Sequence, residues 1–263
     1  MRWAVPVAEL RPGPAAQDIP AVPAAPAAGL LVLPVVGVGE VARGCNLASV
    51  LWDALQTCGA GLLDGDVLVV TQKVVSKAEG RLVELDPADP EAKVRLVESE
   101  AVRVLRRRGE LRITETVHGF VCANAGVDLS NVEDGHACLL PLDPDRSARR
   151  LRDALRALAA VSVAVVISDT FGRAWRRGVT DVAIGCAGIA AILDLRGEAD
   201  AMGRELVATE VCVADEIAAA AELVMGKDRF VPAAIVRGVE RGWFRRSSVA
   251  GEVVRPPAED LFR

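Results

Sequence analysis

The chain has no tyrosine and only two histidines, and aromatic residues make up just 3% of its 263 residues. Hydrophobic residues nevertheless make up 51%, so the core must be built from alanine, valine, leucine and isoleucine. The few aromatics and the net charge of −5 argue against the basic, aromatic surface that binds nucleic acid. Neither His118 nor His136 lies in a nucleophile constellation, which argues against triad chemistry.

Long apolar runs, a signal sequence and paired cysteines are also missing. No run approaches the roughly 20 residues of a membrane span. Residues 1–28 are rich in alanine and proline without a continuous hydrophobic stretch, so we expect a flexible leader ahead of a folded region at 29–263. The six cysteines include no C-x-x-C pair, which rejects a zinc ribbon and indicates reduced thiols. We therefore expect a cytoplasmic protein with no membrane partner.

The two common nucleotide-binding motifs, G-x-G-x-x-G and G-x-x-x-x-G-K-[ST], do not occur. Apolar periodicity predicts strands at 30–36, 67–71, 120–122, 163–167, 206–213 and 230–236, and helices at 47–58, 90–108, 145–160 and 214–225. Because hairpin-like pieces interrupt the alternation of strands and helices, we predict a mixed α+β fold rather than a P-loop or Rossmann fold.

The most informative segment is 163–178, where a continuous apolar run gives way to Ser168, Asp169 and Thr170. A carboxylate and a hydroxyl at the mouth of a buried strand are typical of a site for a hard cation. Two glycines and three arginines follow, and arginine can hold phosphate or carboxylate in bidentate geometry. The alternative interpretation is a buried strand followed by an ordinary polar turn.

A second segment, 116–131, has the same character. It passes from a short apolar stretch into a cluster of Asn124, Asp128, Ser130 and Asn131. Asparagine and aspartate are normal turn residues, so a long loop between strands is one interpretation. The functional interpretation is that Asp128 and Asp169 converge on one or two divalent cations.

Four segments, in order and without a large gap, resemble the coenzyme F420-0:L-glutamate ligase family. They are VLVVTQKVVSKAEGR (67–81), HGFVCANAGVDLSN (118–131), ISDTFGRAWRRGVTDVAIGCAGI (167–189) and GRELVATEVCVADEIAAAAELVMGK (203–227). The resemblance extends from about Val35 to about Val239. Each motif alone is weak, and their combination is specific.

The resemblance implies a GTP-dependent ligase in its stand-alone form, without a nitroreductase-like domain. Such enzymes activate the lactate-derived carboxylate of coenzyme F420-0 with GTP through an acyl phosphate, and L-glutamate then displaces phosphate to form an amide. A second round adds a γ-linked glutamate. Mg²⁺ or Mn²⁺ is required, and K⁺ assists in some members. The family fold is two-lobed, with 101–194 expected as the inner lobe, and it pairs as an intertwined homodimer.

The resemblance also implies roles for individual residues. Those matching metal ligands are Asp128, Asp169 and Thr170. Those matching nucleotide-binding positions are Val38, Gly39, Glu40, Val41, Gln72, Lys77, Asn131, Gly226 and Lys227. Lys77, Arg173 and Arg176 are the candidates for neutralising phosphate charge during catalysis.

Three departures from the family pattern leave two alternatives open. Many members have Gly-Asp-Asp at 44–46, where this chain has Gly-Cys-Asn, and a serine often replaces Gln72. Lys227 and Asp228 stand where some members offer a glutamate to metal. None of these changes removes Asp128 or Asp169. The alternatives are a ligase for a different carboxylate acceptor and a non-catalytic nucleotide- or coenzyme-binding homologue.

Overall fold

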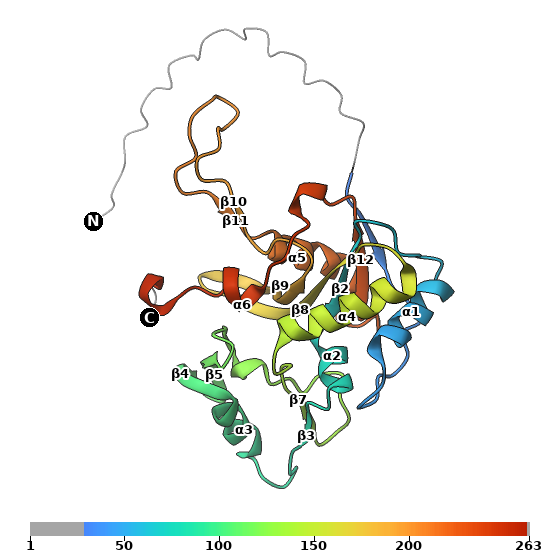
Figure 1. The fold of residues 1–263 in the computed structure, drawn as a ribbon. Helices are drawn as coiled ribbons and strands as arrows, with labels where there is room; N and C mark the ends of the chain where they lie inside the picture. Colours follow the sequence, from blue (N-terminus) through green and yellow to red (C-terminus); the bar gives the residue numbers. More distant parts are fainter. Residues whose placement is uncertain (1–28, 262–263) are drawn as a thin grey trace, which may run out of the picture.

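The structure is a computed structural model that describes residues 29–261, so the predicted leader lies outside the described residues. A five-stranded sheet with the order β1-β12-β2-β8-β9 forms its centre (Figure 1). The strands are β1 (Leu31–Pro34), β2 (Val67–Thr71), β8 (Ala164–Arg173), β9 (Arg176–Ala187) and β12 (Ala233–Arg237). β2 and β8 run parallel, and the other neighbours run antiparallel. The predicted mixed α+β class is confirmed.

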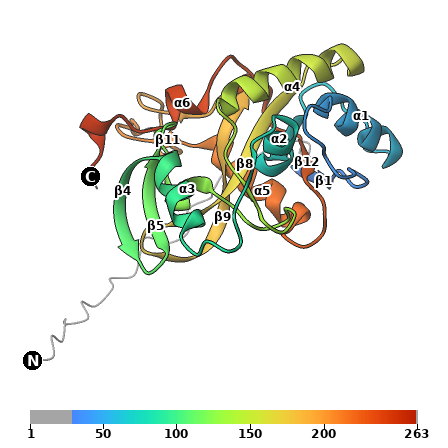
Figure 2. The same cartoon turned by 90° about the horizontal axis from the view of Figure 1, so that it is seen from below.

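Helices cover both faces of this sheet, which explains why its inner strands are continuously apolar. Figure 2 shows α4 (Pro144–Ala159) and α5 (Val213–Met225) on opposite sides of it, with α1 (Leu47–Thr57) beside α4. The helix predicted at 214–225 is α5, and its residues Ile217, Ala218 and Ala221 are buried. No helix in the described part of the chain combines the length and apolar character of a bilayer span.

A smaller lobe lies below the central sheet in the view of Figure 1. It contains the pair β3 (Leu82–Glu84) and β7 (His136–Cys138), helix α3 (Ala92–Glu100), and the three-stranded sheet β4 (Ala101–Arg108), β5 (Leu111–Thr116) and β6 (Val121–Ala123). Its own small core consists of Val97, Ala125, Val127, Ala137 and Leu139. The inner lobe expected at 101–194 stays a prediction; β8 and β9 fall in that range and belong to the large sheet.

Two predicted elements are wrong. The helix expected at 90–108 is helix α3 followed by strand β4, which pairs with β5 through a hairpin. The arginine-rich residues 106–108 therefore lie in a strand and not in the last turn of a helix. Pairing with β5 outweighed the helical spacing of the apolar residues. The strand expected at 206–213 is reduced to β11 (Glu210–Val211), which pairs with β10 (Leu193–Asp194).

A third difference concerns the end of strand β8. The apolar run ends at Ile167 as predicted, yet the strand continues through Ser168, Asp169 and Thr170 to Arg173. Antiparallel pairing with β9 satisfies the backbone of this extension, and the register shifts between Ile167 and Ser168. β2 ends at Thr71, opposite Ser168, so the extension has β9 as its strand neighbour.

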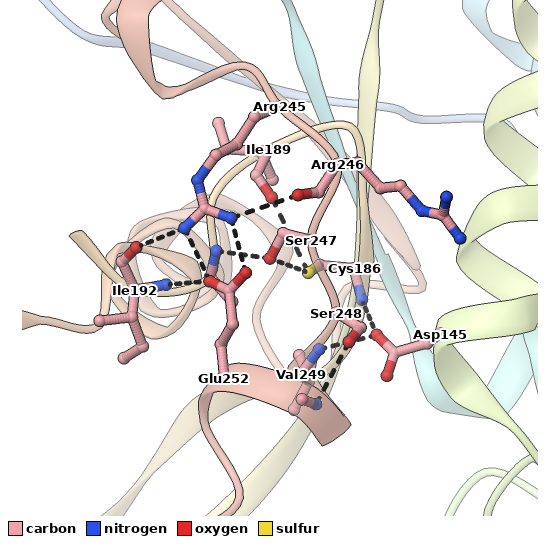
Figure 3. Close-up of polar contacts among 12 residues, drawn as sticks. Asp145, Cys186, Ile189, Ile192, Arg245, Arg246, Ser247, Ser248, Val249 and Glu252 are labelled. Carbon is pink, nitrogen blue, oxygen red and sulfur yellow. Dashed lines mark hydrogen bonds and ion pairs between the residues drawn. The ribbon is translucent and has the colours of Figure 1, made fainter. Parts of the chain in front are cut away.

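The buried carboxylate of Asp145 ties the C-terminal segment to the sheet (Figure 3). It accepts hydrogen bonds from the backbone N–H groups of Cys186 at 2.9 Å, Val249 at 2.8 Å and Ala250 at 3.0 Å. These bonds connect α4, β9 and the short helix α6 (Val249–Glu252). A paired Arg245 and Glu252 close the other side of this network, with nitrogen and oxygen 2.6 Å apart. The network therefore fixes the position of β9 at Cys186, near the end of the strand.

The same contact between α4 and β9 requires a glycine. A Cβ atom placed on Gly185 would lie 2.4 Å from the backbone carbonyl carbon of Pro144. We expect Gly185→Ala to lower the free energy of unfolding by about 1–3 kcal/mol, because backbone must move to admit the methyl group. Gly172→Ala, on β8 with no atom within 4 Å of the new Cβ, is the matched control. Equal stability of the two variants in denaturant titrations would contradict this prediction.

Candidate functional site

A cavity of about 950 Å³ opens beyond the end of β2, beside the extension of β8. We call it the central cavity. Segments far apart in sequence form its wall: 38–43, α2 (Gln72–Ala78), 128–133, the strands β8 and β9, and the 222–232 region at the end of α5. Ligands commonly bind just beyond the carboxyl ends of parallel strands. The cavity has this location, because the pairing of β2 with β8 ends at Thr71 and Ser168 beside it.

Most of the residues singled out from sequence meet in this cavity. They are Val38, Gly39, Glu40, Val41, Lys77, Asp128, Asn131, Asp169, Thr170, Gly226 and Lys227. Their common location is a finding about position, and the role of each stays a prediction.

Three predicted residues lie elsewhere. Gln72 is fully buried behind the cavity wall, where its Oε1 accepts a hydrogen bond from Ser76 Oγ at 2.9 Å. Its Nε2 atom has no partner within the described part of the chain. Arg173 and Arg176 are exposed at the end of the β8–β9 hairpin and do not line the cavity. A contact between these arginines and a ligand would require the ligand to reach beyond the cavity.

Lys73 holds the first acidic side chain of the site. Its Nζ atom lies 2.8 Å from Asp128 Oδ2 and donates to Ser130 Oγ at 2.6 Å. The backbone of Asp128 is fixed by two hydrogen bonds with Cys138, at 3.0 and 2.8 Å. Burial alone would raise the pKa of the Asp128 carboxyl, but Lys73 and the N–H of Ser130 outweigh it and lower that pKa. Asp128 is therefore a preformed carboxylate.

Lys77 faces the cavity from the last turn of α2. Its Nζ atom is 2.5 Å from Glu40 Oε1, and this ion pair connects the helix to the glycine-bearing segment 37–44. Glu40 is 81% exposed whereas Lys77 is only 12% exposed. Because the glutamate is so exposed, this pair contributes little to stability and can separate at low cost when an anionic ligand arrives.

A second cluster surrounds Lys227. The Nζ atom donates to Thr170 Oγ1 at 2.5 Å and Asp181 Oδ1 at 2.7 Å, and it lies 2.9 Å from Glu222 Oε1. Ser168 Oγ donates to the other oxygen of Asp181 at 3.0 Å. Burial would lower the pKa of Lys227, but the two carboxylates outweigh burial and raise it. Lys227 is therefore a stable cation here.

Asp169 differs from these carboxylates because it forms no ion pair with any residue of 29–261. Its pKa is raised to about 7, mainly by burial and in part by the nearby carboxylates of Asp128 and Asp181, while the N–H of Thr170 and the charge of Lys73 oppose the shift. A carboxyl group that shares a cavity with other carboxylates and lacks a counter-charge is well suited to a bound cation.

The donor set supports a hard cation in particular. Asp128, Asp169 and the Thr170 hydroxyl supply oxygen atoms only, which Mg²⁺ and Mn²⁺ accept together with water or phosphate oxygens. In residues 29–261 there is no group of three or more His, Cys, Asp or Glu side chains arranged to hold a metal. A protein-only metal cage is therefore absent there, and the oxygen donors fit an ion that keeps several ligands from elsewhere.

Several cavity residues were missed from the sequence. Lys73 lies in a quoted motif but was not assigned, and Asp181 lies in the motif Gly-Val-Thr-Asp, where nothing local distinguishes it. Glu222 has the sequence signature of a helix surface residue. Phe230 is 85% exposed at the cavity and has a φ of 53°, which is unusual for a bulky residue. Only the fold reveals that these side chains belong to one site.

Comparison with known proteins gives one consistent result. A model of the family described as F420-0:Gamma-glutamyl ligase matches residues 36–238. The chain is 41% identical to the coenzyme F420:L-glutamate ligase of Methanothermobacter thermautotrophicus over 250 residues, which cover 89% of this chain and 99% of the relative. It is 44% identical to the protein of the same name from Methanopyrus kandleri, covering 85% and 94%.

The uncompensated charge of Asp169 predicts a pH-dependent cost to stability. Because folding raises its pKa from 3.8 to about 7, the ionised carboxylate destabilises the fold; the loss grows as pH rises through this interval and is complete above 7. We expect Asp169→Asn to be more stable than the parent by about 2–4 kcal/mol at pH 8 without divalent cations. The advantage should shrink by more than half at pH 4.5.

Thermal and denaturant melts at the two pH values measure this difference. Asp53→Asn, on the exposed side of α1, is the matched control and should leave stability unchanged at both. If the parent is as stable as Asp169→Asn at pH 8, a positive group that the structure does not show must balance the charge of Asp169, and the prediction is wrong.

Proposed function

The chain belongs to the F420-0:gamma-glutamyl ligase family, and we propose that it joins L-glutamate to coenzyme F420-0 through an amide bond, using GTP. The observation that carries this proposal is the charge of the central cavity. Three of the four lysines in the chain, Lys73, Lys77 and Lys227, line it together with Asp128 and Asp169. Phosphoryl transfer to a carboxylate brings several anions together, and such a cavity can hold them.

The proposed chemistry has two steps. An oxygen of the acceptor carboxylate attacks the γ-phosphorus of GTP, the bond to the β-γ bridging oxygen breaks, and GDP leaves. The amine of glutamate then attacks the acyl carbon, inorganic phosphate leaves with the bonding electrons, and the nitrogen loses a proton to solvent. Neither step needs a protein nucleophile, so the residues contribute position and charge. A second cycle on the new product would add a γ-linked glutamate.

Two lysines are suited to the phosphates. Lys73 uses two of its three donors on Asp128 and Ser130, and Lys77 uses one on Glu40. Both therefore keep donors for phosphate oxygens. Asn131, also in the cavity wall, offers an amide to the nucleotide.

Asp128, Asp169 and Thr170 would hold Mg²⁺ or Mn²⁺, which when bound neutralises phosphate charge. Assistance by K⁺ and assembly as a homodimer are parts of the proposal that follow from the family resemblance.

A direct assay tests the reaction. We expect purified protein with coenzyme F420-0, L-glutamate, GTP and Mn²⁺ to yield GDP, phosphate and a product heavier by one glutamyl residue in mass spectrometry. Asp169→Asn should reduce turnover at least about 100-fold, because lost charge at the reacting phosphate is costly. Asp53→Asn should turn over like the parent. Glutamylation of another carboxylate in place of coenzyme F420-0 would identify a different ligase, and binding without any product would identify a non-catalytic homologue.

Nucleotide and divalent cation should bind cooperatively, because a cation held by Asp128 and Asp169 would also neutralise the phosphate charge. At 100 times its dissociation constant, GTP with Mg²⁺ should raise the free energy of unfolding by about 2.7 kcal/mol. GTP alone or Mg²⁺ alone should produce a much smaller shift of the melting temperature. An equal shift with ATP, or one independent of the cation, would contradict the proposed GTP site.

A further inference from the structure

The three contacts of Lys227 use all the donors that an ammonium group has. Thr170, Asp181 and Glu222 surround the Nζ atom at 2.5, 2.7 and 2.9 Å. We call these three oxygen acceptors the Lys227 cage. In this arrangement Lys227 has no N–H left for a phosphate, unlike Lys73 and Lys77. Its predicted nucleotide contact would therefore require the cage to break.

Breaking the cage would be expensive. The side chain of Asp181 is only 3% exposed, and a buried carboxylate without its counter-charge is strongly destabilising. The hydroxyl groups of Ser168 and Thr170 donate to Asp181 as well, at 3.0 and 2.7 Å, but neutral hydroxyls do not replace a positive charge. Asp181 thus needs a cation at the place where the ammonium stands.

The elements that carry the cage are regular and fixed relative to one another. Thr170 and Asp181 are direct partners in the β8–β9 register, and Glu222 lies in the last turns of α5. Gly226, with a φ of 64°, ends α5, and the Lys227 side chain that follows it pairs with Glu222 of the same helix. The three oxygen atoms around the Lys227 ammonium therefore come from two strands and a helix, and none of them comes from a loop.

We propose that Lys227 is a built-in cation of the site, which takes a place that a free cation would otherwise occupy. The cage offers two carboxylates and a hydroxyl, a set of hard oxygen donors. With the ammonium inside, Asp181 and Glu222 are occupied, and a divalent ion in the central cavity is limited to Asp128, Asp169 and the remaining lone pair of the Thr170 hydroxyl. This last step rests on the proposed function, whereas the occupation of the cage does not. Lys227 then acts as a positioning residue that holds Thr170 and Asp181 beside Asp169.

Removal of the ammonium should open the cage to a metal ion. We expect Lys227→Met to bind one more Mn²⁺ per chain than the parent, measured as loss of free Mn²⁺ signal in electron paramagnetic resonance titrations of the full chain without nucleotide. Lys93→Met is the matched control, because Lys93 lies outside the central cavity and forms no ion pair within residues 29–261. It should bind as many ions as the parent.

Stability supplies a second readout that does not depend on activity. Without added metal, Lys227→Met should melt roughly 5 °C or more below the parent, because Asp181 loses its counter-charge. Added Mn²⁺ should recover most of this loss in Lys227→Met and change Lys93→Met no more than the parent. If Lys227→Met does not purify as folded protein, Lys227→Glu prepared with Mn²⁺ provides the same test, since it should unfold when the metal is removed by a chelator.

The outcomes separate this inference from the proposed reaction. Equal Mn²⁺ stoichiometry in Lys227→Met and the parent, or a melting loss that Mn²⁺ does not recover, would overturn the built-in cation. A parent protein that forms no glutamylated product would count against the proposed function and leave the metal count unaffected. An extra Mn²⁺ in the variant supports the inference whether or not the parent itself binds one.

Discussion

The site depends on the unequal lengths of two paired strands. β2 ends at Thr71 opposite Ser168, whereas β8 continues to Arg173 with β9 as its strand partner. The missing length of β2 leaves room for the central cavity, and Asp169 and Thr170 lie along its wall. Because the extension is a hydrogen-bonded strand, these side chains are held by regular backbone rather than by a turn. The network around Asp145 holds the other end of β9, at Cys186.

Charge balance determines how this cavity can work. Asp128 and Asp181 each have a lysine, and Asp169 has none among the described residues. The paired carboxylates are each held by a lysine, while the unpaired one destabilises the fold until a cation approaches. Stability and ligand binding are therefore in conflict at Asp169, as is common where residues serve a site rather than the fold. In this scheme the Lys227 cage satisfies one half of the acidic cluster permanently and leaves the other half for a ligand.

Local pattern predicted the long buried elements well, because burial on both faces produces continuous apolar runs and amphipathic helices. β2 and α1 were predicted almost to the residue. The pattern failed at 101–108, where arginines and valines fit a helix or an edge strand equally well, and only pairing with β5 decided between them. It failed again at 168–173, where polar residues suggested a turn although β9 supplied the partner of a continuing strand.

The sequence by itself determined the α+β class, the family resemblance and most of the motif residues that meet in one cavity, since these follow from residue type and order. Only the tertiary structure decided that Gln72 is buried outside the cavity lining, that Arg173 and Arg176 lie outside it as exposed residues, and that Lys73, Asp181 and Glu222 belong to the site. The physical reason is that charge pairing acts through space. Lys227 and Thr170 are 57 residues apart in the chain, and no local pattern records that an ammonium group and a hydroxyl will share one cage.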